Sequence, residues 1–208
     1  VPVSKYFREK YDRIKLLLTV PTYIRDKKVH TISIVPKCNG KFFEARFVFE
    51  DHDIDSVTND VSNNKALGID IGVNNLCTCV TSDNKSFILD GKRIKSINQW
   101  YNKENARLSS EKDKQKLKGQ THRQCLLTRK RNRRIDDIIY KSAKYIVDYC
   151  LENRIGNVVI GYNDGFQQNA NLGKVNNQHF VMIPVGKLKE RISYLCSKTG
   201  IKFVLQEE

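Results

Sequence analysis

Two short segments of alternating apolar and polar residues lie near the start of the chain. Residues 30–35 alternate, and in residues 43–50 aromatic and aliphatic side chains alternate with Glu and Arg. Between them lies Asn39-Gly40, the strongest short signal for a tight hairpin turn. The pattern predicts a small β module over residues ~18–52, with a short helix before it in residues 1–17.

A polar segment without periodicity, residues 51–64, predicts a linker. After it the chain changes to short apolar runs at residues 66–71, 76–81 and 86–90. The connections between these runs are short, with a turn at Asp83-Asn84. Three strands joined in this way predict an antiparallel meander.

The pattern becomes helical over residues ~94–152, with a break at Gly119. From Ile135 onward apolar residues recur at helical spacing, which predicts one buried face. Residues 103–124 are almost entirely polar.

A fourth strand is predicted at residues 157–160, and its fully apolar sequence is typical of a central, parallel strand. A long polar loop follows. Pro184 is expected in the first turn of a helix that ends at Gly200, and residues 201–205 form a fifth strand.

The predicted order is β-β-β-α-β-α-β, which indicates an α/β fold with a mixed sheet. The first three strands form the meander. The last two strands each follow a helical crossover, and such crossovers are right-handed and join parallel strands.

Positive charge is concentrated in one part of the chain. The 208 residues carry a net charge of +14, and residues 92–144 contain 17 Lys and Arg against 5 Asp and Glu, a net +12. A solvated helix face usually mixes the two signs. The local excess therefore favours a polyanionic partner such as nucleic acid over a merely soluble surface.

The six cysteines form no Cys-x-x-Cys pair, and no apolar run has the length of a signal peptide or a membrane span. These features favour a cytoplasmic protein with reduced thiols and no membrane partner. The chain begins without Met and ends directly after a strand, so we expect it to be a piece of a longer protein.

Asp70 is the main candidate for chemistry. It lies in the apolar run Leu67-Gly-Ile-Asp-Ile-Gly72, on a strand expected at the centre of the sheet. A desolvated carboxylate without a partner costs several kcal/mol, which favours a metal ion or a phosphate-linked role. The alternative is a carboxylate that accepts hydrogen bonds from backbone N–H groups in the turn at Gly72.

Several sequence blocks follow one another in a characteristic order. They are GIDIGVNN at 68–75, DGKRIKSIN at 90–98, WYNK at 100–103, TRKRN at 128–132, VIGYN at 159–163, NQHFVMIP at 177–184 and GI at 200–201. Through these blocks the chain resembles the transposon-encoded OrfB/TnpB proteins of insertion sequences, which are related to the type V CRISPR effector nucleases.

The resemblance implies an RNase H-like (RuvC-like) fold in which the five strands take the spatial order 3-2-1-4-5. It also implies two domains. Residues 1–60 would be part of a wedge-like β module with its linker, and residues 61–208 a RuvC-like nuclease domain that is incomplete at its C-terminus.

The implied activity is that of an RNA-guided DNA endonuclease of transposase type, in which three carboxylates hold two Mg²⁺ ions for phosphodiester hydrolysis. Asp70 matches the first carboxylate. Gly161 occupies the position where many relatives have the second, and we expect Glu207 or Glu208 to replace it, with a preference for Glu208. The third carboxylate and a zinc-binding segment are expected beyond residue 208.

Guide RNA and target DNA are the partners that the resemblance implies. The basic run at residues 128–134 is expected to contact phosphates rather than bases. The predicted nucleic-acid-binding residues are Arg129, Lys130, Arg131, Arg133, Arg134, Lys92 and Arg93.

Two alternatives remain. The chain could be a catalytically inactive remnant that binds nucleic acid, which Gly161 and the missing third acid favour. It could also be an actin-like phosphotransferase, because Gly-Ile-Asp-Ile-Gly resembles a phosphate-binding motif. The residues Val73 to Leu76 fit that second family poorly, and the basic helix would have no role in it.

Overall fold

The structure is a computed structural model that describes residues 5–10, 18–50, 60–72, 74–162 and 183–207. The contacts divide the chain into two compact units, residues 1–52 and 53–208. The assignment of the first to a wedge-like domain stays a prediction.

The first unit contains the predicted β-hairpin. Its elements are α1 (Lys5–Lys10), a 3-10 helix η1 (Thr22–Ile24), β1 (Val29–Lys37) and β2 (Phe42–Phe49). The strands pair antiparallel, and Cys38, Asn39 and Gly40 between them all have positive φ, of 51°, 54° and 79°. Asn and Gly adopt this left-handed conformation more readily than other residues, which is why the turn forms here.

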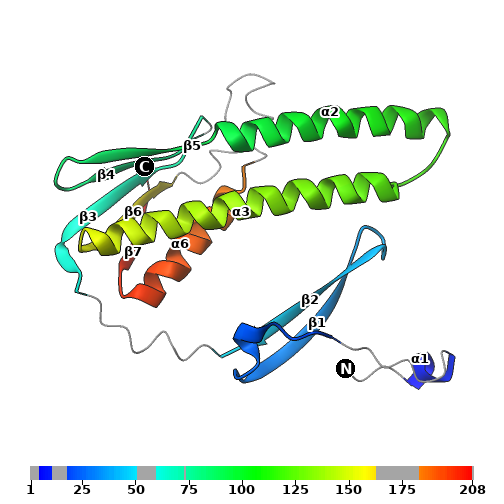
Figure 1. Cartoon of the computed structure of the whole chain (residues 1–208), viewed down its shortest axis with the longest axis horizontal. Helices are drawn as coiled ribbons and strands as arrows, with labels where there is room; N and C mark the ends of the chain where they lie inside the picture. The colour runs from blue at the N-terminus through cyan, green and yellow to red at the C-terminus, as the bar shows by residue number, and fades with distance from the viewer. Residues whose placement is uncertain (1–4, 11–17, 51–59, 73, 163–182, 208) are drawn as a thin grey trace. The chain divides into compact units, whose positions relative to one another are not determined.

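The second unit is built on a five-stranded mixed sheet (Figure 1). Its strands are β3 (Ser62–Asp70), β4 (Asn75–Thr81), β5 (Ser86–Asp90), β6 (Ile155–Tyr162) and β7 (Lys202–Glu207). They lie in the order β5-β4-β3-β6-β7, with β3, β4 and β5 antiparallel and β6 and β7 parallel to β3. The predicted order and strand directions are confirmed.

The predicted linker extends too far, because β3 begins at Ser62 and not at Ala66. The polar residues 62–64 are held by the distant β6. The Ser62 amide donates to the Arg154 carbonyl at 2.9 Å, and the Asn157 side-chain amide donates to the Asn63 carbonyl at 2.7 Å. These partners lie about ninety residues away in the sequence, so no local pattern could indicate them.

In the described residues of this unit, three helices accompany the sheet: α2 (Lys92–Lys114), α3 (His122–Glu152) and α6 (Val185–Thr199). The predicted break between α2 and α3 is confirmed, with Gly119 at φ 75°. Pro184 precedes α6 as its N-cap residue and is not its first helical residue as expected, whereas Gly200 ends the helix at φ 72°. In the described part of the chain, no helix is both long and apolar enough to cross a membrane.

One face of the sheet is covered and forms the core. Leu67 and Ile69 of β3 pair laterally with Val158 and Ile160 of β6, and all four are at most 3% exposed. The helices contribute the apolar stripe of α3 and the residues Leu188, Ile192 and Cys196 of α6. Since side chains alternate along a strand, Gly68 and Asp70 point to the opposite face.

Five of the six cysteines are buried in this unit. Cys77, Cys79, Cys125, Cys150 and Cys196 are each 0% exposed, and no disulfide forms. Burial raises the pKa of the Cys79, Cys150 and Cys196 thiols to about 12, so they stay protonated at neutral pH. They therefore act as small apolar side chains.

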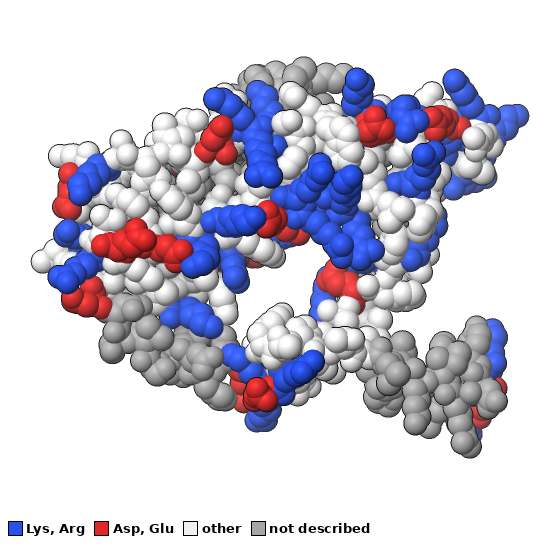
Figure 2. Space-filling model, viewed as in Figure 1, with Lys and Arg blue, Asp and Glu red and all other residues white. Residues whose placement is uncertain are grey.

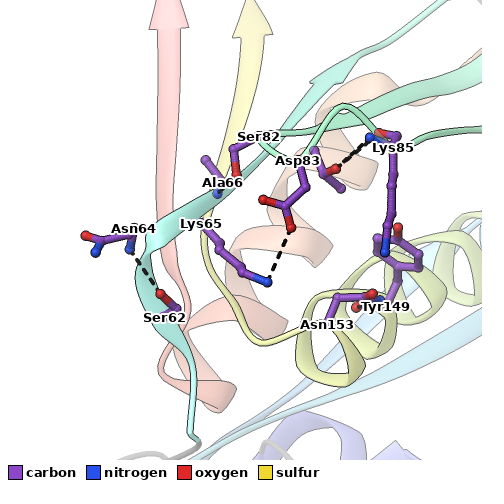
Figure 3. A network of polar contacts seen from close by, with 10 residues as sticks. Ser62, Asn64, Lys65, Ala66, Ser82, Asp83, Lys85, Tyr149 and Asn153 are labelled. Atoms are coloured by element: carbon purple, nitrogen blue, oxygen red, sulfur yellow. Dashed lines mark hydrogen bonds and ion pairs between the residues drawn. The ribbon is translucent and has the colours of Figure 1, made fainter.

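A network of polar contacts fastens the end of the sheet where β3 begins (Figure 3). Lys65 and Asp83 form an ion pair with a distance of 3.3 Å between the Lys65 Nζ and a carboxylate oxygen. The Ala66 amide donates to the Ser82 hydroxyl at 3.3 Å. These contacts tie the β4–β5 turn to β3 at the end opposite Asp70.

The N-terminus of α3 carries a capping box that fixes where the helix begins. The Gln124 amide donates to the Thr121 hydroxyl at 3.2 Å, and the Thr121 amide donates to the Gln124 side chain at 3.1 Å. These contacts satisfy two backbone donors that the helix itself leaves without partners.

Thr121→Ala should lower the free energy of unfolding by about 1 kcal/mol, because one capping acceptor is lost. Urea unfolding followed by circular dichroism measures the effect. Ser110→Ala, at an exposed site inside α2, is the matched control and should change stability by less than about 0.5 kcal/mol. Equal stability of the two variants would contradict a capping role for Thr121.

Candidate nucleic-acid interface

Asp70 is the last residue of β3 and its side chain is exposed. It pairs with Thr78 of β4. On the other side Ile69 pairs with Ile160, so the next position of β6, Gly161, lies beside Asp70. Asp70 therefore stands at the carboxyl edge of the sheet, where ligands of open α/β sheets commonly bind.

The register of β7 against β6 shows which residues at the end of β7 share the face of Asp70. Gly161 pairs with Gln206 and Tyr162 pairs with Glu207. By strand alternation Gln206 shares the face of Asp70, whereas Glu207 belongs to the opposite face. Glu208, the preferred acid, lies outside the described residues.

The described residues do not by themselves make a complete metal site. Among them, no three His, Cys, Asp or Glu side chains lie close enough together to hold a metal ion. Mg²⁺ prefers several hard oxygen ligands, and Asp70 is a suitable first one. Its face-sharing neighbours at the edge, Gly161 and Gln206, add no further carboxylate.

The helix pair α2–α3 begins at this same edge. β5 runs parallel to β3, so their carboxyl ends coincide, and α2 follows β5 directly. The Gly91 amide donates to the Asn74 carbonyl at 2.9 Å, and the Lys92 amide to the Asp90 carboxylate at 2.7 Å. The first bond ties the start of α2 to the β3–β4 turn just beyond Asp70, and the second ties it to the end of β5.

A tryptophan positions two of the predicted cations. Lys130 Nζ and Arg134 Cζ both lie 5.6 Å from the centre of the Trp100 ring, within the range of cation–π attraction. Trp100 is eight residues from the start of α2, about 12 Å along the helix. The two cations are thus held over an aromatic surface near the carboxylate edge.

Basic residues gather on the surface where α2 and α3 run side by side (Figure 2). Lys92, Arg93 and Arg133 are exposed, and no ion pair with another described residue is recorded for them. We call the exposed cations Lys92, Arg93, Arg129, Lys130, Arg133 and Arg134 the basic surface.

Arg131 differs from its neighbours, because it is half-buried between the helices. Its Nε donates to the Asn98 side-chain oxygen at 2.9 Å, and its guanidinium lies 5.7 Å from the Tyr101 ring centre. Burial lowers its pKa. Arg131 thus joins α3 to α2, and its case for phosphate contact is weaker than that of the basic surface.

The polar residues between the helices also form an ordered seam. Gln124 is 4% exposed, and its side-chain amide donates to Ser109 at 3.1 Å and to Asn105 at 3.4 Å. The hydroxyls of Tyr101 and Thr128 lie 3.1 Å apart. This seam explains how a segment with few apolar residues forms a defined helix pair.

A family model, OrfB_IS605, described as a probable transposase, matches residues 47–167, which is more than half of the chain. The chain belongs to this transposase family. The expected resemblance is confirmed. A search of the curated proteins gives no significant match.

Solved structures share the fold. A Cas12f1–sgRNA–target DNA complex matches 88% of this chain with a TM-score of 0.60 and 17% identity, and a CRISPR-Cas12f ternary complex matches 86% with a TM-score of 0.54 and 15% identity. The chain spans 36% and 35% of those proteins. At these identities the similarity establishes the RuvC-like fold of this family member.

Sequence reasoning did not predict a binding role for Trp100, and it treated all five cations at residues 129–134 alike. Trp100 lies thirty residues from the cations it supports, so helical spacing alone could not connect them. The lone tryptophan of the chain, set in a polar segment, was the available signal.

Replacing Arg131 and Arg133 in turn separates the packing role from a surface role. Arg131→Met should lower the free energy of unfolding by about 1–3 kcal/mol, since it leaves the buried Asn98 without its guanidinium donor. Arg133→Met, at an exposed site two residues away, should change it by less than about 0.5 kcal/mol. Thermal and urea unfolding measure both values, and equal losses would contradict the assignment.

Proposed function

We propose that this chain carries the nuclease domain of an RNA-guided DNA endonuclease of the OrfB/TnpB type, with the basic surface binding a nucleic-acid backbone beside a metal-dependent centre at Asp70. The observation that carries the proposal is the position of the basic surface. It starts at the edge of the sheet where Asp70 stands, and Trp100 holds two of its cations.

Phosphate binding is the function that this surface supports best. Exposed cations attract a polyanion, and each phosphate contact releases bound counterions. The surface offers mainly Lys and Arg side chains beside the Trp100 ring. This composition suits contact with guide RNA or an RNA–DNA duplex through its backbone.

Asp70 is proposed as the first metal ligand. When bound, Mg²⁺ would supply electrostatic stabilisation for phosphodiester hydrolysis. Glu208, or Glu207, is proposed as a further metal ligand. It would replace the carboxylate that is absent at position 161, where this chain has glycine. The position of Glu207 opposite Tyr162, on the other face of the sheet, favours Glu208.

A second function is supported by one observation. The described residues bring a single carboxylate to the site and put Gly161 and Gln206 beside it. Such a site would bind Mg²⁺ weakly. The chain of 208 residues would then bind nucleic acid without cutting it.

Removing a cation of the basic surface tests the binding function. Arg133→Gln should reduce the slope of log affinity against log salt by about 0.7–0.9, and weaken binding of guide-like RNA about fivefold at 0.1 M salt. Fluorescence anisotropy over a series of salt concentrations measures both quantities.

Lys141→Gln is the matched control for that experiment. Lys141 lies on the same helix and is 77% exposed, but it forms an ion pair with Asp137 at 2.9 Å. Its removal should leave the salt slope nearly unchanged. If both variants lose affinity equally, only net charge matters, and the basic surface is not a defined binding site.

Removing the Asp70 carboxylate tests the metal site. Asp70→Asn should weaken Mn²⁺ binding at least tenfold, because the proposed charged ligand is lost. Electron paramagnetic resonance of free Mn²⁺ measures the change. Asp83→Asn, at the opposite end of the sheet, should bind Mn²⁺ as the unaltered chain does.

The same two variants test for cleavage. No Mg²⁺-dependent cutting of DNA by the 208-residue chain is expected. If the unaltered chain cuts DNA and Asp70→Asn still cuts it, the assignment of Asp70 as a metal ligand is wrong. If Asp70→Asn abolishes cutting, only the expectation that the chain is inactive is wrong.

A further inference from the structure

A second cationic and aromatic cluster lies where α3 and α6 pack side by side (Figure 1). The guanidinium carbon of Arg191 lies 5.3 Å from the ring centre of Tyr140 and 5.0 Å from that of Tyr194. The two tyrosines are 46% and 39% exposed. We call these three residues the tyrosine–arginine cluster.

The charge of Arg191 is not balanced by a neighbouring acid in the described part of the chain. Its Nε is buried and has no hydrogen-bond partner there. The nearby acid Asp136 is engaged by Lys187, whose Nζ lies 2.6 Å from its carboxylate. Arg191 therefore contacts tyrosine rings, which do not neutralise its charge, so its guanidinium can attract an anionic partner.

Other charges along this half of α3 are already paired. Lys141 contacts Asp137 and Lys144 contacts Asp148, at 2.9 Å and 2.8 Å. The tyrosine–arginine cluster thus differs from the paired charges on this half of α3. A partner drawn to it would need both a negative charge and a flat group that stacks on an exposed ring.

The cluster lies in line with the basic surface. Arg133 and Tyr140 are seven residues apart on α3, which places them on the same face and about 10 Å apart along the helix axis. That distance corresponds to about three stacked nucleotides at 3.4 Å each. One strand could therefore contact both groups.

We propose that the tyrosine–arginine cluster binds an unpaired stretch of the same nucleic acid that lies on the basic surface. A base stacks on the exposed face of Tyr140 or Tyr194, and Arg191 contacts the adjoining phosphate. The inference rests on the proposed function and adds a single-strand site to it.

The chemistry favours an unpaired strand over a duplex or a protein. In a duplex the flat faces of the bases are covered by their neighbours, whereas unpaired bases stack readily on aromatic side chains. Tyr and Arg are also common in protein interfaces. The unbalanced charge of Arg191, in line with further cations, favours a polyanion here.

The experiment uses the whole chain and a fluorescent single-stranded RNA of mixed sequence, with a hairpin RNA of the same composition beside it. Tyr140→Ala and Tyr194→Ala should each weaken single-strand binding about fivefold or more, with the salt slope unchanged, because stacking releases no counterions. Arg191→Gln should reduce that slope by about 0.7. Binding of the hairpin stem should change little.

Two matched variants control for folding and for loss of any tyrosine. Tyr140→Phe keeps the ring and should bind as the unaltered chain does. Tyr145 is 52% exposed on the same helix but packs edge-on against Phe87 with ring centres 5.7 Å apart, so Tyr145→Ala should leave binding unchanged. Melting temperatures are measured for every variant, and Tyr194→Ala replaces Tyr140→Ala if the latter does not fold.

The outcomes separate the two proposals. If Arg133→Gln weakens binding but the folded tyrosine variants do not, the inference is overturned and the proposed function stands. Equal losses for single strand and stem would also overturn it, as would a tyrosine variant that changes only self-association in sedimentation. If the unaltered chain binds no nucleic acid, both proposals are wrong.

Discussion

The parallel pairing of β3 with β6 is the interaction on which the second unit depends. It joins a meander of local contacts to strands that arrive about ninety residues later, and it sets Asp70 beside Gly161. The approach is close: a side chain at Gly156 would bring a Cβ within 2.6 Å of the Ser62 carbonyl oxygen. The Asn157 side chain bonds to the Asn63 and Lys65 carbonyls where the register shifts. Loss of this pairing would separate the carboxylate edge from the rest of the sheet.

Aromatic rings contact several cations of the second unit. Trp100 supports Lys130 and Arg134, Tyr101 supports Arg131, and two tyrosines support Arg191. An aromatic face orients a cation without neutralising it, whereas a carboxylate does both. A surface built in this way keeps its attraction for phosphate. Away from it, on α3, Lys141 and Lys144 are paired with acids in the ordinary manner of a solvated helix.

The chain belongs to a transposase family and has a RuvC-like fold, but the residues beside Asp70 add no second carboxylate. Gly161 and Gln206 flank Asp70 on the same face of the sheet. A glycine brings no ligand, and a neutral amide oxygen is a weaker ligand for Mg²⁺ than a carboxylate. Under the proposed function, the further acidic ligands of the metal site must therefore come from outside the described residues.

The sequence by itself determined most of the secondary-structure elements, and the family resemblance carried by its motifs gave the order of the strands in the sheet. Periodicity of two and of 3.6 residues identified the strands 76–81 and 86–90 and the apolar stripe of α3, because burial of one face repeats locally along the chain. The Asn-Gly turn and Gly119 were evident for the same reason, since positive φ is a property of one or two residues. The apolar run around Asp70 indicated it as a candidate ligand, and the family resemblance matched it to the first carboxylate. Only the tertiary structure decided that residues 62–64 belong to β3, that Arg131 packs between helices while Arg133 is exposed, and that Glu207 points away from Asp70. It also brought Trp100 to Lys130 and Arg191 to Tyr140. Each of these depends on contacts between segments far apart in the sequence, and a local pattern carries no information about which distant residue will be the partner.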